Sequence, residues 1–344
     1  MADKIEFIHG IDLCRGFYHD VVKPLLQKFS PELNYSSSLI GYGSDVMGFD
    51  TATSMDHNWG PRMQIFVDDK SKITEIDNYL CRELPALYKN FPVNFSEPAY
   101  DKVQRMERPG KNEINHLIEI VVFEDYLKTR YAMDKISNFT LHDWLAFKDQ
   151  SLIEITGGEV FHDGLGKLNK AREELKFYPD EICKLRLAVL WHYISNKEAF
   201  IGRSRELGDI TGLKIQAGRI VNYLIKILFY LEKKYIPYSK WFGSAFKQLE
   251  SYSAAGKLAE EILCENDPAA IEEKLCDFYT LVIEDHNKTP GMPRLKNTVR
   301  NYHNRPYRVI FSENIMGELL GGIEDEEVKN TNLRAYAHDI ILDE

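Results

Sequence analysis

The segment between Ser38 and Val67 places the strongest constraint on what this chain can fold into. A short apolar run, Ser38-Leu39-Ile40, leads directly into the turn Gly41-Tyr42-Gly43-Ser44-Asp45. Twelve positions after Ser44 the chain reads Asp56-His57-Asn58-Trp59-Gly60-Pro61-Arg62, and a second apolar run, Met63–Val67, follows. Runs bounded by glycine and polar turn residues are typical of strands. We therefore predict strands at 37–42 and 62–67, joined by a glycine-rich loop with an acidic residue at the mouth of the second strand.

Apolar periodicity predicts helices around these strands. Residues 11–28 place apolar side chains on one helical face, and residues 73–89 do the same, with Pro85 favouring a kink or an early end. The connection over 90–112 contains several prolines, and residues 113–123 are rich in β-branched residues, which indicates a further strand. This order predicts an α+β fold, in which residues 1–134 form a domain with a small mixed sheet and flanking helices.

Helical periodicity dominates from about residue 135. The segments predicted to be helical are 140–152, 179–207, 210–235, 239–251 and 254–266, and a further one begins at 268. Asp267 and Pro268 are suited to the N-cap and the first position of that last helix. We predict that residues 135–344 form a mainly α-helical C-terminal domain.

The amino-acid composition limits the classes of molecule that this chain can bind. The 344 residues carry a formal net charge of −10, which disfavours binding to nucleic-acid backbones and to anionic lipid. The longest apolar stretch, 223–231, is interrupted by Lys226 and is too short to span a membrane. The first residues show no apolar signal-peptide core, and the five cysteines have no CxxC spacing, so we expect a cytoplasmic protein with reduced thiols.

The two strands and their loop supply the groups that nucleotidyl transfer needs. This reaction depends on positioning a triphosphate and on divalent-metal electrostatics. Gly43 and Ser44 could cradle the phosphates with backbone N–H groups and a hydroxyl. Asp56 could hold Mg²⁺ or Mn²⁺ through its carboxylate oxygens. Glu119 lies between Ile118 and Ile120 on the predicted third strand, where side-chain alternation leaves it free to point into the site.

These motifs resemble the signature of the nucleotidyltransferase superfamily that includes polymerase beta and the antibiotic-modifying enzymes. That signature consists of Gly-Ser, a spacer, and Asp-x-Asp at the opening of a strand. The resemblance implies a metal set of Asp56, Asn58 and Glu119, but Asn58 stands where the pattern has a second acid. An amide oxygen can ligate Mg²⁺ without contributing charge, so the affinity for one metal should fall.

A closer resemblance covers most of the chain. The block at 56–62 is similar to the hallmark of a bacterial family of uncharacterised nucleotidyltransferase-like proteins, and the likeness continues at 157–166, 200–209 and 234–243. It implies the superfamily fold followed by a helical domain, and it supplies no substrate. In antibiotic nucleotidyltransferases of similar layout a helical-domain glutamate is the general base, which makes Glu206 the candidate here.

Charged and aromatic residues supply further candidates for nucleotide binding. They are His57, Arg62, Arg203, Arg205, Tyr238 and Lys240. Flanking the first motif, His57 and Arg62 could contact phosphate or position the loop. In the helical segments, the arginines and Lys240 could reach the triphosphate while Tyr238 stacks on the base. The alternative is a solvated helix face with intrahelical ion pairs.

Three other motifs suggest different chemistries. Arg186 and His192 have the Arg-x5-His spacing of helical toxin ribonucleases, but six positions on a helix do not share one face. His-Asp pairs at 19–20, 142–143, 162–163 and 338–339 suggest a metal phosphohydrolase, although their contexts differ and the third indicates a turn. Ser253–Lys257 lacks the glycine spacing of a phosphate loop.

The sequence thus favours a Mg²⁺-dependent nucleotidyltransferase that moves a nucleoside monophosphate from an NTP to a hydroxyl or amine. The acidic charge favours a small-molecule or protein acceptor over nucleic acid. The alternative is a catalytically weakened or inactive protein that binds a nucleotide or a partner on the same scaffold, because Asn58 replaces the second metal acid. The acceptor, the base of the NTP and the oligomeric state are left open.

Overall fold

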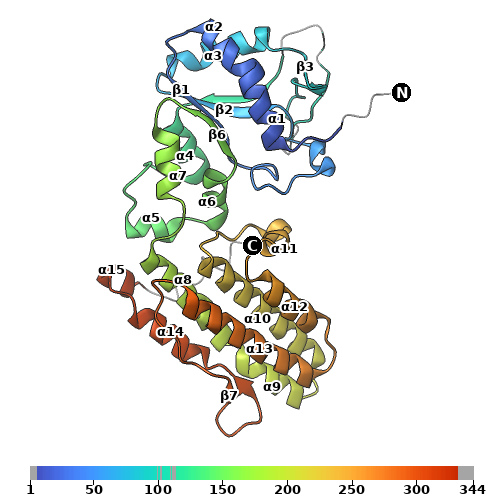
Figure 1. Ribbon diagram of the computed structural model, residues 1–344, viewed down its shortest axis with the longest axis vertical. Coiled ribbons are helices and arrows are strands. Elements are labelled where there is room, and N and C mark those ends of the chain that lie inside the picture. The colour runs from blue at the N-terminus through green and yellow to red at the C-terminus, as the bar shows by residue number, and fades with distance from the viewer. Residues whose placement is uncertain (1–5, 99, 101–102, 109, 111–113, 332–344) are drawn as a thin grey trace. The chain divides into compact units, whose positions relative to one another are not determined.

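The chain folds into two compact units. The computed structural model describes residues 6–98, 100, 103–108, 110 and 114–331. The first unit comprises residues 1–139 and 151–176, and the second comprises 140–150 and 177–344. The first unit contains a small mixed sheet and the second is largely helical, which confirms the predicted α+β class (Figure 1).

A four-stranded sheet organises the first unit. Its strands are β1 (Tyr35–Leu39), β2 (Arg62–Val67), β5 (Leu117–Val121) and β6 (Glu159–Asp163), in the order β5-β2-β1-β6. β1 pairs antiparallel with both β2 and β6, whereas β2 and β5 are parallel. The predictions of strands at the first three positions are confirmed. Sequence reasoning missed β6, and its interpretation of His162-Asp163 as a turn was wrong because these residues pair with β1.

Helices near the N-terminus cover one face of this sheet. Residues predicted as one helix form a continuous run of α1 (Gly10–Phe17), the π-helical turn η1 (Tyr18–Val22) and α2 (Lys23–Phe29). Together with α3 (Ser71–Glu83), this run packs a hydrophobic core against alternate sheet residues, including Met63, Ile65 and Ile118. The early end of α3 before Pro85 confirms the expected effect of that proline.

The opposite face of the sheet carries the polar residues. Gln64 is in register with Glu119 on β5 and with Ser38 on β1, so all three side chains lie on one face. Phe66 extends this face toward α4 (Phe123–Tyr131), where its ring packs against those of Phe123 and Tyr126. Buried Ser38 and Gln64 make this face more polar than the one beneath α1 to α3.

Short elements complete the first unit. They are η2 (Ala52–Asp56), β3 (Leu87–Tyr88), β4 (Phe91–Pro92), α6 (Asp149–Thr156) and α7 (Lys167–Glu174). β3 and β4 form a hairpin, in which β3 lies at the end of the segment predicted to be helical and β4 lies in the connection predicted to be irregular. The N-terminal end of α6 belongs to the second unit and the rest to the first, so the chain passes between the units along this helix.

Helices build the second unit around α10 (Ile210–Leu231), which packs against α8, α9, α12 and α13. The other helices are α5 (Leu141–Ala146), α8 (Asp180–Ser195), α9 (Glu198–Glu206), α11 (Ser239–Phe246), α12 (Tyr252–Cys264), α13 (Pro268–Lys288), α14 (Ser312–Gly321) and α15 (Glu326–Lys329). A hairpin of β7 (Arg300–Asn301) and β8 (Arg308–Val309) precedes α14. Helices occur in every segment predicted to be helical, but two of the segments predicted as single helices are each divided in two: 140–152 into α5 and α6, and 179–207 into α8 and α9. Asp267 caps α13 by accepting the Ala269 N–H at 3.2 Å. Within the part of the chain that the structure describes, no helix is long and apolar enough to cross a membrane.

Replacing His286 on α13 by glutamine should reduce the stability that the protein loses when the pH falls. The ring is fully buried and its Nε2 lies 2.9 Å from the Pro293 carbonyl oxygen. Burial lowers the pKa of His286, although the Pro293 contact acts in the opposite direction. The unfolded chain therefore takes up this proton at a higher pH than the folded chain, and stability falls as the pH drops below about 6.5.

Glutamine at this position does not titrate and can still donate to the Pro293 carbonyl. Thermal melts of both proteins between about pH 7.5 and pH 5.5 measure the effect. The variant is expected to lose less thermal stability than the wild type over this range. Equal losses of thermal stability in the two proteins would show that His286 does not cause the loss.

Candidate functional site

The turn after β1 requires glycine at two positions. Gly41 and Gly43 have φ values of +91° and +136°, which residues with a side chain rarely adopt. A Cβ at Gly43 would lie 2.2 Å from an oxygen of Asp45 and 2.5 Å from a nitrogen of Arg62. The turn is therefore packed too tightly around Gly43 for any larger residue.

This turn presents backbone donors that the protein does not use. The N–H groups of Ile40 and Gly41 are taken by Gln64 Oε1 and by the carbonyl of Glu154, at 3.0 and 2.8 Å. Among the described residues, the next three N–H groups, those of Tyr42, Gly43 and Ser44, form no hydrogen bond. All three residues are at least partly exposed. Successive free N–H groups in such a turn can bind an anion.

A buried ion pair supports the turn from below. Arg62, at the start of β2, lies 2.7 Å from Asp45 Oδ1 and donates to the Tyr42 carbonyl at 3.0 Å. The two charged side chains are only 5% and 1% exposed. Burial by itself lowers the pKa of Arg62, but the Asp45 carboxylate and other nearby groups outweigh it and raise the net value. Arg62, predicted to contact phosphate or position the loop, is thus committed to holding the loop.

Glu119 lies on β5 beside an arginine that sequence reasoning missed. Its Oε2 accepts a hydrogen bond from Arg130 on α4 at 2.8 Å, and its side chain is 38% exposed. Arg130 also stacks over the rings of Tyr42 and Tyr126, with its guanidinium carbon 5.6 and 4.9 Å from their centroids. Glu119 is therefore connected through Arg130 to the turn that carries the free N–H groups.

The predicted metal residues before β2 lie outside any strand. Asp56 ends η2, its side chain is 63% exposed, and its Oδ1 lies 2.6 Å from His57 Nδ1. Asn58 adopts a φ of +46° and exchanges two hydrogen bonds with Gln104: its N–H donates to the Gln104 carbonyl, and its Oδ1 accepts the Gln104 N–H, each at 2.8 Å. The amide oxygen predicted to ligate a metal is thus already used to hold the neighbouring loop.

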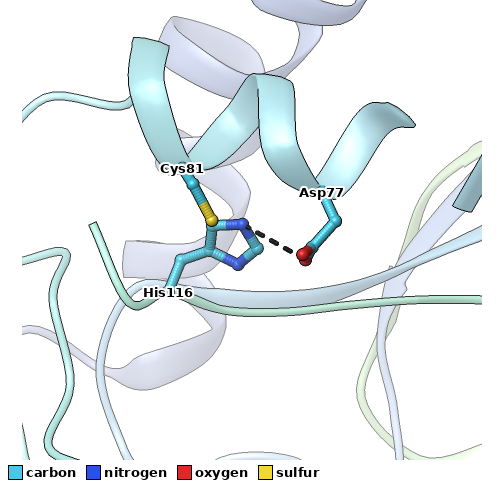
Figure 2. A group of neighbouring side chains, drawn as sticks. All are labelled: Asp77, Cys81 and His116. Atoms are coloured by element: carbon cyan, nitrogen blue, oxygen red, sulfur yellow. Dashed lines mark ion pairs between the residues drawn. The ribbon is translucent and has the colours of Figure 1, made fainter. Parts of the chain in front are cut away.

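Among the described residues, Asp56 and Glu119 belong to no group of three closely spaced His, Cys, Asp or Glu ligands. Such a group occurs elsewhere in the first unit, at Asp77, Cys81 and His116, whose ligand atoms lie within 4.8 Å of one another (Figure 2). Asp77 and Cys81 extend from α3 toward the His116 ring, which precedes β5. Burial lowers the pKa of His116, while Asp77 acts in the opposite direction.

The predicted charged residues of α9 hold the chain that follows β7. Arg205 pairs with Glu272 and donates to the Pro306 carbonyl at 2.8 Å. Glu206 accepts hydrogen bonds from the Tyr307 hydroxyl and, at 2.7 Å, from Arg203. The Tyr307 hydroxyl, followed by Arg203, holds the pKa of Glu206 below its usual range, which makes this carboxylate a weaker base.

The remaining predicted nucleotide-binding residues surround the start of α11. Tyr238 occupies the N-cap position, is 37% exposed, and donates its N–H to Gln150 Oε1 at 3.2 Å. Lys240 lies over the ring of Trp241, with its Nζ 5.0 Å from the centroid. These residues, with Arg203, Arg205 and Glu206, belong to the second unit, whereas Gly43, Ser44, Asp56, His57, Asn58, Arg62 and Glu119 belong to the first.

The residues that suggested a ribonuclease or a phosphohydrolase lie within helices and a strand. Arg186 is buried in an ion pair with Asp149, whereas His192 lies near the end of α8, where Asn196 donates to its carbonyl. The His-Asp pairs fall in η1, α5 and β6, and the fourth, at 338–339, lies outside the described residues. None of the described pairs belongs to a three-ligand group.

Comparison with known families matches residues 144–242 to the family described as a domain of unknown function, DUF4037. The match begins in α5 and ends in α11, so it contains the predicted residues of the second unit and none of those between Gly43 and Glu119. It covers less than half of the chain, and its description assigns no activity. No curated protein matches the chain significantly.

Proposed function

We propose that this protein binds a nucleoside triphosphate and transfers its nucleoside monophosphate to a hydroxyl or amine of a small-molecule or protein acceptor. The observation that carries the proposal is the set of free N–H groups on Tyr42, Gly43 and Ser44. Three adjacent donors in one turn suit the β- and γ-phosphates, whose negative charge grows as pyrophosphate leaves. The partly exposed Ser44 hydroxyl can add a fourth donor.

Mg²⁺, or Mn²⁺ in its place, would be held by Asp56 and Glu119. Both offer carboxylate oxygens, the ligand type that Mg²⁺ prefers, and both side chains are open to water, which Mg²⁺ retains in its shell. Asn58 fits this role less well, because its Oδ1 already accepts the Gln104 N–H. The metal would polarise the phosphate under attack and neutralise charge on the leaving group.

The other residues of the first unit would act on the triphosphate by positioning. Arg62, tied to Asp45, fixes the turn that carries the donors. Arg130 would hold Glu119 in place and, when a nucleotide enters, offer its guanidinium to a phosphate oxygen. His57 would orient Asp56 through the Nδ1 contact. Arg203, Arg205, Glu206, Tyr238 and Lys240 have no required part in this scheme.

Turnover tests the proposal. The full-length protein is incubated with Mg²⁺, each NTP and a panel of hydroxyl and amine acceptors, the protein itself included, and pyrophosphate release is measured. We expect Mg²⁺-dependent release that falls by about a hundredfold or more in Asp56→Asn and Glu119→Gln. Glu83→Gln, an exposed carboxylate of α3 that pairs with Lys28, is the control and should retain activity. Pyrophosphate release that is unchanged in both Asp56→Asn and Glu119→Gln would refute the proposed function.

One observation favours the alternative of a nucleotide-binding protein without turnover. Asn58 adds no charge, and both its backbone and side chain are used to hold Gln104. A protein of this kind would bind NTP at the turn and release no pyrophosphate with any acceptor. Asn58→Asp distinguishes the two cases, because restoring the second acid should create or increase turnover only where the scaffold is otherwise competent.

A further inference from the structure

Three side chains of different donor type converge between α3 and β5. Asp77 and Cys81 are four residues apart on α3, so they project from the same helical face. His116 immediately precedes β5 and its ring faces both of them (Figure 2). One ligand atom of each residue lies within 4.8 Å of those of the other two.

His116 supplies the second observation that points to a ligand. Its side chain is 3% exposed, and its Nε2 has no hydrogen-bond partner among the described atoms. Asp77 Oδ1 lies 3.7 Å from this nitrogen, beyond hydrogen-bond distance. A buried nitrogen without a partner is costly unless something else satisfies it.

We propose that Asp77, Cys81 and His116 bind a transition-metal ion of the Zn²⁺ class. Thiolate and imidazole donors select Zn²⁺ and related ions, whereas Mg²⁺ takes oxygen. Tetrahedral zinc brings such ligand atoms to roughly 3.3–3.8 Å from one another, and the Nε2–Oδ1 separation is already 3.7 Å. Asp77 is 50% exposed, so a water molecule can reach a fourth position.

Binding requires two changes of protonation. The Cys81 thiol releases its proton to solvent as the metal–sulfur bond forms. His116 Nδ1 accepts the Ile118 N–H at 3.2 Å, so the neutral ring carries its proton on Nε2. Coordination through Nε2 moves that proton to Nδ1 and gives up the contact with Ile118. The exchange replaces one long hydrogen bond with three coordinate bonds.

This site is separate from the proposed nucleotide site. Side chains alternate along β5, so His116 and Ile118 face α3 while Glu119 faces α4. A metal bound here would join α3 to the start of β5 and stabilise the first unit. It would also be insensitive to an excess of Mg²⁺, because the donor set contains sulfur and nitrogen.

Metal titration of the full-length, chelator-treated protein in excess Mg²⁺ tests the site. We expect one Co²⁺ per chain with an absorption band from cobalt–thiolate charge transfer, and a thermal midpoint that rises with added Zn²⁺. Cys81→Ser should abolish the band, and His116→Gln and Asp77→Asn should each weaken binding by about tenfold or more. Cys264→Ser, which removes an exposed thiol on α12, should leave both readouts unchanged.

Thermal melts of the metal-free variants show whether each is folded. Cys81→Ser is the decisive variant because it changes one atom and keeps a polar side chain. The absence of a charge-transfer band in the wild type would overturn the proposal. The proposal would also be overturned if Cys81→Ser kept both the band and the Zn²⁺-dependent rise in thermal midpoint.

A second inference rests on a cavity in the helical unit. The cavity has a volume of about 570 Å³ and lies among residues of α8, α10 and the loop before α9. Four of its lining residues are cationic and none is acidic, in a chain of net charge −10. The cations are Lys197, Lys214, Arg219 and Lys226.

Among the described residues, no carboxylate forms an ion pair with Lys197 or Arg219, and Lys214 donates to the neutral Asn266 side chain. Lys197 Nζ lies 5.6 and 5.7 Å from the ring centroids of Tyr193 and Tyr223, which stack on each other. Burial, followed by the charge of Arg219, lowers the pKa of Lys197. An anion in the cavity would relieve this repulsion.

We infer that this cavity binds a small ligand that carries two or more phosphate groups. Its volume is within the range of small-molecule sites, and its charge matches a polyphosphate. The inference is independent of the proposed function, since all lining residues belong to the second unit.

Calorimetry with tripolyphosphate, in the absence of divalent metal, tests this cavity. We expect saturable binding that weakens about tenfold in Lys197→Gln and in Arg219→Gln and is partly rescued by Arg219→Lys. Lys257→Gln, an exposed lysine on α12, should have no effect. Binding that is equal in all variants, or a preference for an RNA oligonucleotide over tripolyphosphate, would overturn the inference.

Discussion

Asp149→Ala is expected to destabilise the helical unit by about 3–5 kcal/mol, because it leaves the buried Arg186 without its counter-charge. Asp149 and Arg186 are 4% and 3% exposed and lie 3.1 Å apart. Asp149 also accepts hydrogen bonds from the Tyr178 hydroxyl at 2.7 Å and from the Ile236 N–H at 2.8 Å. The substitution therefore removes the acceptor for several buried donors at once.

Denaturant unfolding measures this loss. The double variant Asp149→Ala/Arg186→Met should recover much of it, because no charge then stays buried without a partner. Glu173→Ala is the surface control, since its partner Lys176 lies 3.8 Å away and both side chains are more than 70% exposed. If Asp149→Ala were as stable to denaturant as Glu173→Ala, the ion pair would have no central role in stability.

Asp45→Ala should cost a similar amount, about 3–5 kcal/mol, in the first unit. Arg62 would remain buried without a carboxylate, and the Val46 N–H would lose the acceptor that now lies 3.0 Å away. Arg62 also holds the Tyr42 carbonyl, so the turn with the free N–H groups should loosen as Arg62 moves. We expect weaker NTP binding in addition to the lower stability.

The isosteric variant Asp45→Asn separates these two effects. It keeps an oxygen for Arg62 and Val46 but removes the negative charge, so it should lose less stability than Asp45→Ala. Denaturant unfolding and NTP titration are carried out on both variants. Unfolding of Asp45→Ala at the same denaturant concentration as the wild type would contradict a stabilising role for the Asp45–Arg62 pair.

Much of this fold follows from local patterns in the sequence. Apolar periodicity predicted α10 and α13, because a helix that packs on one side repeats its apolar residues with the helical period. α8, which was also predicted to be helical, is buried on nearly all sides instead. β6 could not be found in this way. It is short and polar, and it becomes a strand by pairing with β1, which lies more than a hundred residues earlier.

The turn of the candidate site was predictable, whereas the partners of its side chains were not. Gly41 and Gly43 stand out because few residue types other than glycine adopt the positive φ values of this turn. The acid directly after Ser44 is visible in the sequence, yet nothing local indicates that Asp45 is buried against Arg62. Arg205 and Glu206 illustrate the same limit: their contacts with Glu272 and Tyr307 span 67 and 101 residues.

Calorimetric titration of each NTP with Mg²⁺, on wild type, Asp56→Ala and the control Glu83→Gln, measures whether a nucleotide binds beside the turn after β1. Lys197→Gln is included so that binding in the cavity of the second unit is recognised separately. We expect saturable binding of at least one NTP that weakens in Asp56→Ala and stays unchanged in Glu83→Gln. No binding of any NTP, or binding that Asp56→Ala leaves intact, would contradict the proposed function.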